Sequence, residues 1–340
     1  MSSAQRLQTR QIWEMAAAAG LYALMAVVLF SPHARTLSSS FRLLYAVNPP
    51  TAALGVFLLS RRWVSGWMPS AAGGLLYGFG PFAMSFIGFH PLAGFTFAAV
   101  GWLLLPAVYW QRGCRPTPTR FVARAVLCVL PFLFIVAFFW TFSQHWAGRL
   151  FLLPRNIVLH VHDFAGFFLP LSMTRQPIVI GLYHSGLIAL LMGVFVYALA
   201  QRVAVIIPAA VGLVLAFMNP VLGVGSVVWA AFPMLFVAVL AGIGLQSMLW
   251  AGKSDSKYLL FCALAALGIG AVSAALYLPN THLAYRNPAL FYLASSAVLG
   301  VFFLLSRSGL RWLGMRWCLI AGLVLADCYL SARWMVDRLL

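Results

Sequence analysis

Runs of about 20 predominantly apolar residues, the length a helix needs to cross a bilayer, repeat along this chain of 340 residues. Lipid offers no partner for an unpaired backbone amide or carbonyl, so such runs are expected to be helical. The runs, counting shorter and proline-interrupted ones, are 13–31, 44–60, 70–89, 91–110, 122–142, 177–200, 203–219, 225–250, 258–278, 289–306 and 318–335. The sequence therefore predicts an all-α, polytopic membrane bundle of about eleven transmembrane helices, forming a single transmembrane domain over 1–340.

Charge and composition exclude other classes. Hydrophobic residues make up 63% of the chain and charged residues 8%, against about 25% charged residues in soluble proteins. The formal net charge is +17. We expect no nucleic-acid partner, because the cations are scattered along the predicted membrane edges without a clustered face. Five cysteines without a CxxC pair exclude a disulfide-stapled fold.

Arginine and lysine predict the orientation, because they are retained on the cytoplasmic side. A cytoplasmic amino terminus puts 14 of the 22 cations inside and eight outside. The bias is strongest in the predicted loop 111–124, which holds four arginines. The polar first eleven residues and the long apolar run after them predict an uncleaved first span.

In this topology all seven histidines fall on the outer side. Six lie in outward loops or at helix ends: His33, His90, His145, His160, His162 and His282. His184 lies roughly 10 Å below the outer surface at 1.5 Å per residue. Two explanations stay open: histidine as a weakly polar interface residue, or a polar cavity in the outer half.

One long segment, 143–176, lies outside the predicted spans on the outward side. It is rich in Leu and Phe, so we expect it to be interfacial or re-entrant. On a helix, Asn156, His160 and Asp163 would share a face. On a strand, His160 and His162 would share a face, and Asp163 would point away. A proline before this stretch and a glycine near its end favour the helix.

Acidic side chains are scarce, which makes each one informative. They are Glu14, Asp163, Asp255, Asp327 and Asp337. Asp255 lies in a lysine-flanked turn and Asp337 near the end of the chain, so both are expected to be solvated. Glu14 follows Arg10 by one helical turn, and we expect the two to pair.

The other two acids are candidates for a special role. Asp327 lies within an apolar run, where a carboxylate needs a buried partner or a function; that partner is Arg333 or a residue of a neighbouring span. Asp163 is the best candidate for catalysis, as a general base with His160 or His184 as the auxiliary acid or base.

A metal site is not predicted. His160, His162 and Asp163 have side chains that suit zinc or iron, but HxHD on a helix does not direct both imidazoles at one ion. No HExxH, CxxC or acidic cluster accompanies it. The cofactor is left open, and a haem or pigment on His184 or His160 is the alternative we keep.

The stretch from Asn48 to Gly113 resembles a known family. It holds LLYGFGPF, an outward GFHPL turn and a Leu-Pro pair before a basic turn, and the residues that carry the likeness are Gly80, Pro81, Phe82, His90 and Pro106. These resemble the early spans of GT-C type membrane glycosyltransferases, which take sugars from polyprenyl-phosphate donors. The resemblance implies a catalytic acid in the first outward loop. Here that loop, SPHARTLSSSFRLLY, has no carboxylate.

Three functions remain as alternatives. The favoured one is a non-catalytic helical subunit, or a binder of a lipid-linked ligand, in a complex in the bacterial inner membrane. The second is a polyprenyl-phosphate-dependent glycosyltransferase with Asp163 as base. The third is a transporter with broken helices near Pro49–Pro50, Pro220 and Pro233. A lipid-linked phosphate would be held by outward arginines, namely Arg35, Arg42, Arg149, Arg155, Arg175 and Arg286, together with His90 and His184. The partners expected are membrane lipids, this ligand and other membrane subunits.

Overall fold

The computed structural model describes residues 3–34, 43–64, 66–87, 91–109, 118–146, 158–175, 178–200, 206–280, 282–309 and 312–339. The α-helices are α1 (Ser3–Phe30), α2 (Leu43–Ser60), α3 (Trp67–Gly78), α4 (Pro81–Ile87), α5 (Pro91–Tyr109), α6 (Pro118–Trp146), α7 (His184–Ala200), α8 (Ile206–Phe217), α9 (Ala231–Trp250), α10 (Ser256–Asn280), α11 (Leu283–Arg307) and α12 (Leu313–Leu339). Short 3₁₀ helices are η1 (Ser31–His33), η2 (Val161–Phe167), η3 (Ser172–Arg175) and η5 (Ser226–Ala230). Strand pairing in these residues is limited to an isolated bridge between Val221 and Val224, so the all-α prediction is confirmed.

Six helical segments within the described residues are long and apolar enough to cross a membrane. They are Gln11–His33, Leu43–Ser60, Ser226–Trp250, Ser256–Pro279, Leu283–Arg307 and Leu313–Arg338. Their burial differs: 78% of the Ser226–Trp250 window is inside the bundle, against 28–33% for the last two segments. The helix α9 therefore forms the interior, and α11 and α12 present most of their apolar surface outward, as lipid-facing helices do.

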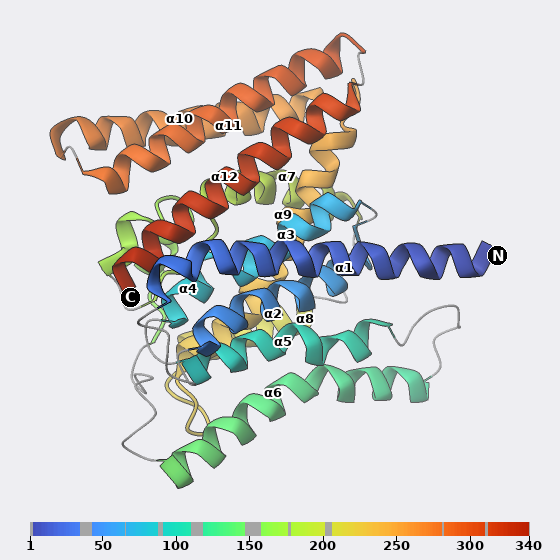
Figure 1. The fold of residues 1–340 in the computed structure, drawn as a ribbon, viewed down its shortest axis with the longest axis vertical. Helices are drawn as coiled ribbons and strands as arrows, with labels where there is room; N and C mark the ends of the chain where they lie inside the picture. The colour runs from blue at the N-terminus through green and yellow to red at the C-terminus, as the bar shows by residue number, and fades with distance from the viewer. Residues whose placement is uncertain are drawn as a thin grey trace.

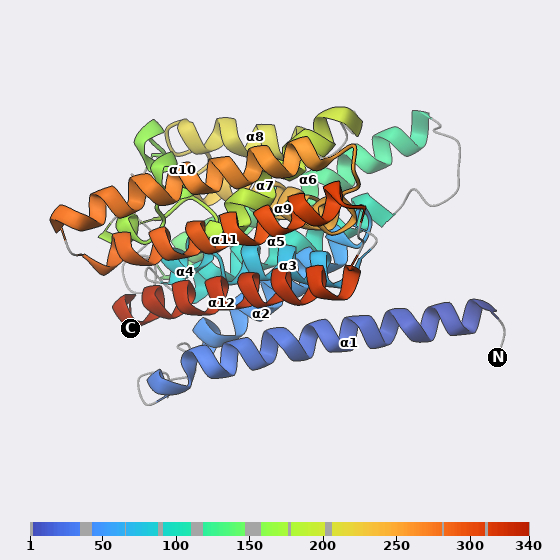
Figure 2. The ribbon, with the colours of Figure 1, turned by 90° about the horizontal axis from the view of Figure 1, so that it is seen from above.

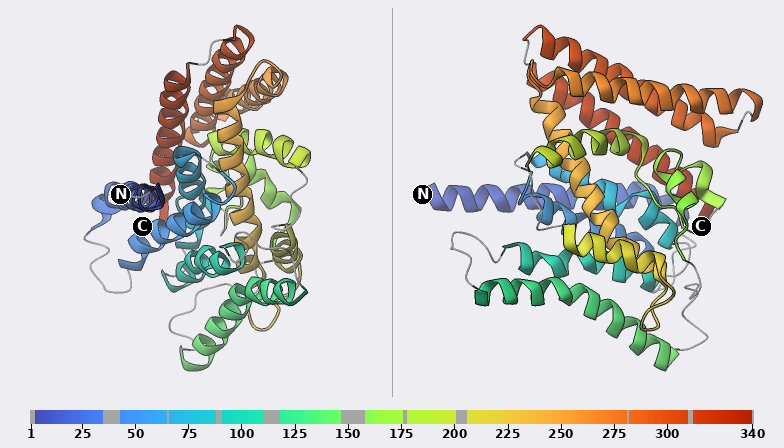
Figure 3. Two further views of the ribbon diagram at one scale, coloured as in Figure 1. Left: turned by 90° about the vertical axis from the view of Figure 1, so that its right-hand side faces the viewer. Right: turned by 180° about the vertical axis from the view of Figure 1, so that it is seen from behind.

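The arrangement has two sides joined through α9. An antiparallel hairpin of α10 and α11 forms one side, next to α12, and α5 and α6 form the other (Figure 1). Seen from behind, α9 crosses obliquely between them (Figure 3). The helix α1 lies along the outside of the bundle beside α2 and α12, and its amino-terminal part extends past them (Figure 2).

Glycines allow the closest helix contacts. A Cβ on Gly244 of α9 would meet the backbone carbonyl of Ala189 in α7, and a Cβ on Gly193 of α7 would meet the carbonyl of Leu240 in α9. The two backbones can approach this closely because neither glycine has a side chain, which is the small-residue packing typical of membrane helices. Gly74 and Gly78 of α3 play the same part against α2.

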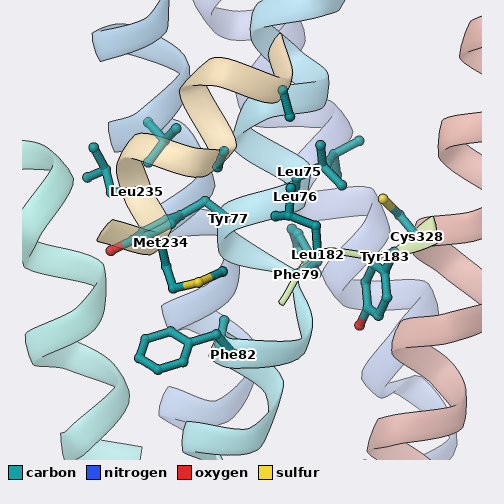
Figure 4. Packing of buried hydrophobic residues seen from close by; sticks show 14 of the residues in the cluster. Leu75, Leu76, Tyr77, Phe79, Phe82, Leu182, Tyr183, Met234, Leu235 and Cys328 are labelled. Carbon is teal, nitrogen blue, oxygen red and sulfur yellow. The ribbon is translucent and has the colours of Figure 1, made fainter. Parts of the chain in front are cut away.

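The predicted span 70–89 is not one helix. It breaks between α3 and α4 at Phe79 and Gly80, because Pro81 has no backbone N–H and disfavours helical angles in the residue before it. Figure 4 shows Phe79 and Phe82 at this break, with Leu182 and Tyr183 close by. The break is thus filled by apolar side chains from distant parts of the chain.

A second break precedes α7. The span predicted over 177–200 is helical only from His184, and residues 178–183 are buried without being helical. The backbone N–H of Val179 donates to the Ser85 hydroxyl at 3.2 Å. Irregular backbone at membrane depth is tolerated where protein surrounds it, as it does here.

The prolines that were expected to break transmembrane helices do not all do so. The helix α2 runs without a break through Pro49 and Pro50, so that prediction is wrong. The Thr51 hydroxyl donates to the Val47 carbonyl at 2.8 Å, but the carbonyls that the two missing N–H groups would reach in a helix are those of Tyr45 and Ala46. Pro233 lies in the first turn of α9, where its missing N–H costs nothing, whereas Pro220 lies in a non-helical segment.

Candidate functional sites

The segment predicted to lie on the outward side lacks the expected helix at His160. This residue has extended backbone angles, φ −111° and ψ 156°, and the 3₁₀ helix η2 begins only at Val161. The helical face proposed for Asn156, His160 and Asp163 is therefore wrong at His160, because the chain bends there. Asn156 lies outside the described residues.

The Asp163 carboxylate caps this bend. Its Oδ2 accepts a hydrogen bond from the backbone N–H of His160 at 2.7 Å, and its Oδ1 lies 3.4 Å from Nε2 of His162. The Asp163 side chain is 14% exposed and that of His162 is 65% exposed. The predicted catalytic pair, Asp163 and His160, is thus adjacent and joined through the backbone of His160.

Most of the predicted anion-binding residues fall outside the part of the chain that the structure describes. These are Arg35, Arg42, Arg149, Arg155 and His90. Arg175 ends η3, but its side chain is not among those described. The predicted arginine clamp therefore stays a prediction.

His184 belongs to a polar cluster inside the bundle, where α7 begins against α12. Both the His184 imidazole and the Asp327 carboxylate are 0% exposed, and His184 Nδ1 lies 2.8 Å from Asp327 Oδ1. Asp327 Oδ2 accepts from the backbone N–H and the hydroxyl of Ser185, each at 2.7 Å. The Ser331 hydroxyl donates to Oδ1 at 3.1 Å. Four donors thus satisfy a carboxylate that would be costly alone.

Aromatic rings of α11 enclose the imidazole. Phe291 stacks on His184 at 5.5 Å between centroids, and Tyr292 meets it edge-on at 5.1 Å. The other ring nitrogen, Nε2, is buried and has no hydrogen-bond partner among the described residues. The carboxylate also faces the positive end of the α7 dipole, so the cluster holds α7 against α12.

One of the two predicted partners of Asp327 is wrong and the other is confirmed. Arg333 pairs instead with Asp337, at 3.5 Å, and donates to the Tyr329 hydroxyl at 3.1 Å. The partners of Asp327 are His184 and Ser185 of the neighbouring helix α7, together with Ser331 of α12 itself. A carboxylate inside an apolar run was a sufficient signal of a buried partner, but nothing in the sequence pointed to Ser185.

Arg316 forms a second buried polar centre, which nothing in the sequence predicted. It is 2% exposed. Its Nη1 donates to the carbonyls of Leu249 and Ala251 at 3.2 and 2.9 Å, and its Nη2 to the Ser306 hydroxyl at 2.8 Å. The guanidinium thus caps the carboxyl end of α9, where the helix dipole is negative.

Replacing Arg316 with lysine is expected to lower the free energy of unfolding by about 1–2 kcal/mol, because an ammonium keeps the charge but not the planar fork that reaches the two carbonyls through Nη1 and the Ser306 hydroxyl through Nη2. Denaturant unfolding in detergent measures this. The matched control is Arg307→Lys, at an exposed position, which is expected to change stability by less than about 0.5 kcal/mol. Equal effects of the two substitutions would contradict the capping role.

A crevice with a volume of about 680 Å³ lies between α1, α2 and α5. Its walls are mostly apolar. The lining residues are Gln11, Ile12, Glu14, Met15, Phe57, Leu58, Arg61, Trp102, Leu105 and Pro106. Most ligand pockets have this composition, apolar walls with a few convergent polar groups, and volumes of about 300–1,000 Å³.

The charged groups of the crevice join α1 to α2. Arg61 Nη2 lies 2.6 Å from Glu14 Oε2, and the Trp67 indole donates to the Glu14 carbonyl at 2.8 Å. The partner predicted for Glu14 was Arg10, whose side chain is not described; the tertiary structure adds Arg61, 47 residues away. The adjacent Arg62 is exposed. This end of the crevice is therefore polar, with the Arg61 guanidinium beside the Glu14 carboxylate.

No protein-family model, curated protein or solved structure matches this chain.

Proposed function

We propose that this chain is a multi-pass membrane protein that binds an amphiphile with a phosphate head group in the α1–α2–α5 crevice, as a non-catalytic subunit of a membrane complex. One observation carries the proposal: the crevice combines long apolar walls with a guanidinium at one end. The walls suit a hydrocarbon chain, and arginine suits a phosphate, which it binds with two parallel N–H donors. The resemblance to GT-C glycosyltransferases supports a lipid-linked phosphate as the class of ligand.

The proposal includes the topology. Eleven crossings with a cytoplasmic amino terminus, in the inner membrane of a bacterium, agree with the positive-inside bias. The charged end of the crevice would then face the cytoplasm. Glu14 lies about 24 Å from the end of α1 at Phe30, at 1.5 Å per residue. His33 follows in η1 and lies 3.0 Å from Asp337 at that far end of the bundle.

Outer-face glycosyl transfer with Asp163 as base is the second candidate. The adjacency of Asp163 and His160 favours this candidate. The crevice does not favour it, because its charged end lies at the other end of the bundle from these two residues. Arg338 donates to Thr174 of η3 at 2.8 Å, so η3 lies at the same end of the bundle as His33 and away from Arg61. Replacing Asp163 with asparagine and measuring sugar transfer tests it, and unchanged transfer would contradict it.

Transport is third, and the broken helices before α4 and α7 are the features in its favour.

The crevice is tested with a polyprenyl phosphate and the matching uncharged polyprenol, titrated into the full-length protein in nanodiscs. We expect the phosphate to bind more tightly than the alcohol. Arg61→Gln should weaken binding of the phosphate by about tenfold, the loss of one charge-assisted hydrogen-bonded contact, and should leave binding of the alcohol unchanged. Since this substitution also leaves Glu14 without Arg61, the double variant Glu14→Gln, Arg61→Gln is measured beside it. Arg307→Gln, on an exposed site of α11, is the matched control. Equal affinity of wild type for phosphate and alcohol would contradict the proposal.

A further inference from the structure

We propose that His160, His162 and Asp163 bind a divalent transition-metal ion of the zinc class. One ligand atom from each residue, an imidazole nitrogen or a carboxylate oxygen, lies within 4.8 Å of the other two. Two imidazoles and one carboxylate form a donor set that suits zinc and related metals. The site lies at the opposite end of the bundle from the crevice and does not depend on the function proposed above.

The bend at His160 brings the imidazoles together. On a regular helix, two residues at i and i+2 point about 200° apart, which was the reason to expect no metal. In the structure His160 is extended rather than helical. The His160 and His162 rings consequently lie near each other, with centroids 5.2 Å apart and planes inclined by 23°, and a ligand nitrogen of each lies within 4.8 Å of the other. The geometric objection to a shared ion therefore no longer holds.

The carboxylate is held in place for coordination. Asp163 Oδ2 is fixed by the backbone N–H of His160 at 2.7 Å, which leaves Oδ1 to face the imidazoles. Hydrogen bonds of this kind orient metal ligands. Oδ1 lies 3.4 Å from His162 Nε2, near the separation of about 3.3 Å that a tetrahedral zinc ion imposes on two ligand atoms bonded at 2.0–2.1 Å. Only the exposed His160 ring needs to move inward.

The exposure of the two histidines distinguishes this group from a cluster of polar side chains that only stabilises the fold. His160 and His162 are exposed, and so is Val161 between them, so the rings do not contribute to the hydrophobic core. Three protein ligands leave at least one coordination position for water or an anion, as in catalytic rather than structural zinc sites. With neutral imidazoles and one carboxylate, the ion would give the site a net charge of +1.

Titration with Co²⁺ tests the proposal, since tetrahedral Co²⁺ has intense visible absorption bands. The sample is full-length protein in detergent, stripped with a chelator and free of a histidine tag. One Co²⁺ per chain should bind and be displaced by Zn²⁺. His160→Ala and His162→Ala should each weaken binding by about tenfold or more. Asp163→Asn should also weaken it, although its amide oxygen can still accept from the His160 backbone, so this variant separates coordination from folding.

The control is His282→Asn. The His282 side chain caps α11 by accepting a hydrogen bond from the Ala284 N–H, a role that asparagine also fills. The substitution removes a histidine from the same end of the bundle. The affinity of this variant for Co²⁺ should equal that of wild type. The proposal is overturned by absence of stoichiometric Co²⁺ binding in wild type, or by equal binding in the double variant His160→Ala, His162→Ala.

Discussion

Asp327→Ala is expected to lower the free energy of unfolding by about 3–5 kcal/mol, the usual cost of removing one partner from a buried charged pair. The substitution strips the acceptor from His184 Nδ1, the Ser185 backbone N–H and the Ser185 hydroxyl, all inside the bundle. Neither water nor lipid replaces it there, so these donors stay unpaired. The carboxylate belongs to α12 and three of its four donors belong to α7, so the substitution should weaken the contact between these two helices.

Two further substitutions show whether the free energy of unfolding depends on the charge of Asp327 or on the shape of its side chain. Asp327→Asn retains the shape and one acceptor, and we expect an intermediate loss of about 1–3 kcal/mol. The same change at Asp337, which is on the same helix and 47% exposed, should cost less than about 1 kcal/mol. Denaturant unfolding in detergent gives all three values. If Asp327→Asn and Asp337→Asn were equally stable, the buried carboxylate would not be what holds α7.

Gly244→Ala is expected to destabilise the protein by about 1–3 kcal/mol, the usual cost of overpacking. The new Cβ meets the backbone carbonyl of Ala189. A backbone atom cannot rotate away as a side chain can, so α7 and α9 must separate along their contact. Gly193→Ala should have a similar effect, because its Cβ meets the Leu240 carbonyl on the same interface. The two substitutions together should cost less than the sum, since one separation relieves both collisions.

Gly322→Ala is the matched control. Gly322 lies within α12, and a Cβ there meets nothing within 4 Å. The substitution should be neutral or should stabilise by up to about 1 kcal/mol, because alanine loses less backbone entropy in a helix. The comparison cancels helix propensity, which is the same in both cases. A Gly244→Ala variant as stable as Gly322→Ala would contradict the close contact of α7 with α9.

The sequence was least informative where local chemistry and tertiary packing disagree. Pro81 breaks the span that contains it, as local chemistry dictates, whereas Pro49 and Pro50 lie within a continuous helix. The difference lies in the surroundings. The packing of α2 against α3 and α5 offsets the two missing donors. Propensity alone does not include these contacts.

The same limit applies to the sites. The scarcity of acids marked Asp327 and Asp163 as unusual from the sequence. Their partners could not be predicted from the sequence. Ser185, which binds Asp327, is 142 residues away, and His160, which binds Asp163, was expected on a helix that the chain does not form there. The crevice was not predicted, because it depends on how far α1 stands from α5.

The sequence by itself determined the class of this protein. Apolar runs of membrane-spanning length leave helices as the only way to satisfy the backbone in lipid, so an all-α bundle followed from hydropathy alone. The tertiary structure decided which carboxylate is buried, which arginine caps a helix, which glycines lie at contacts and where a ligand can fit. These features depend on contacts between residues far apart in the chain, and hydropathy reports only on the preference of each segment for lipid.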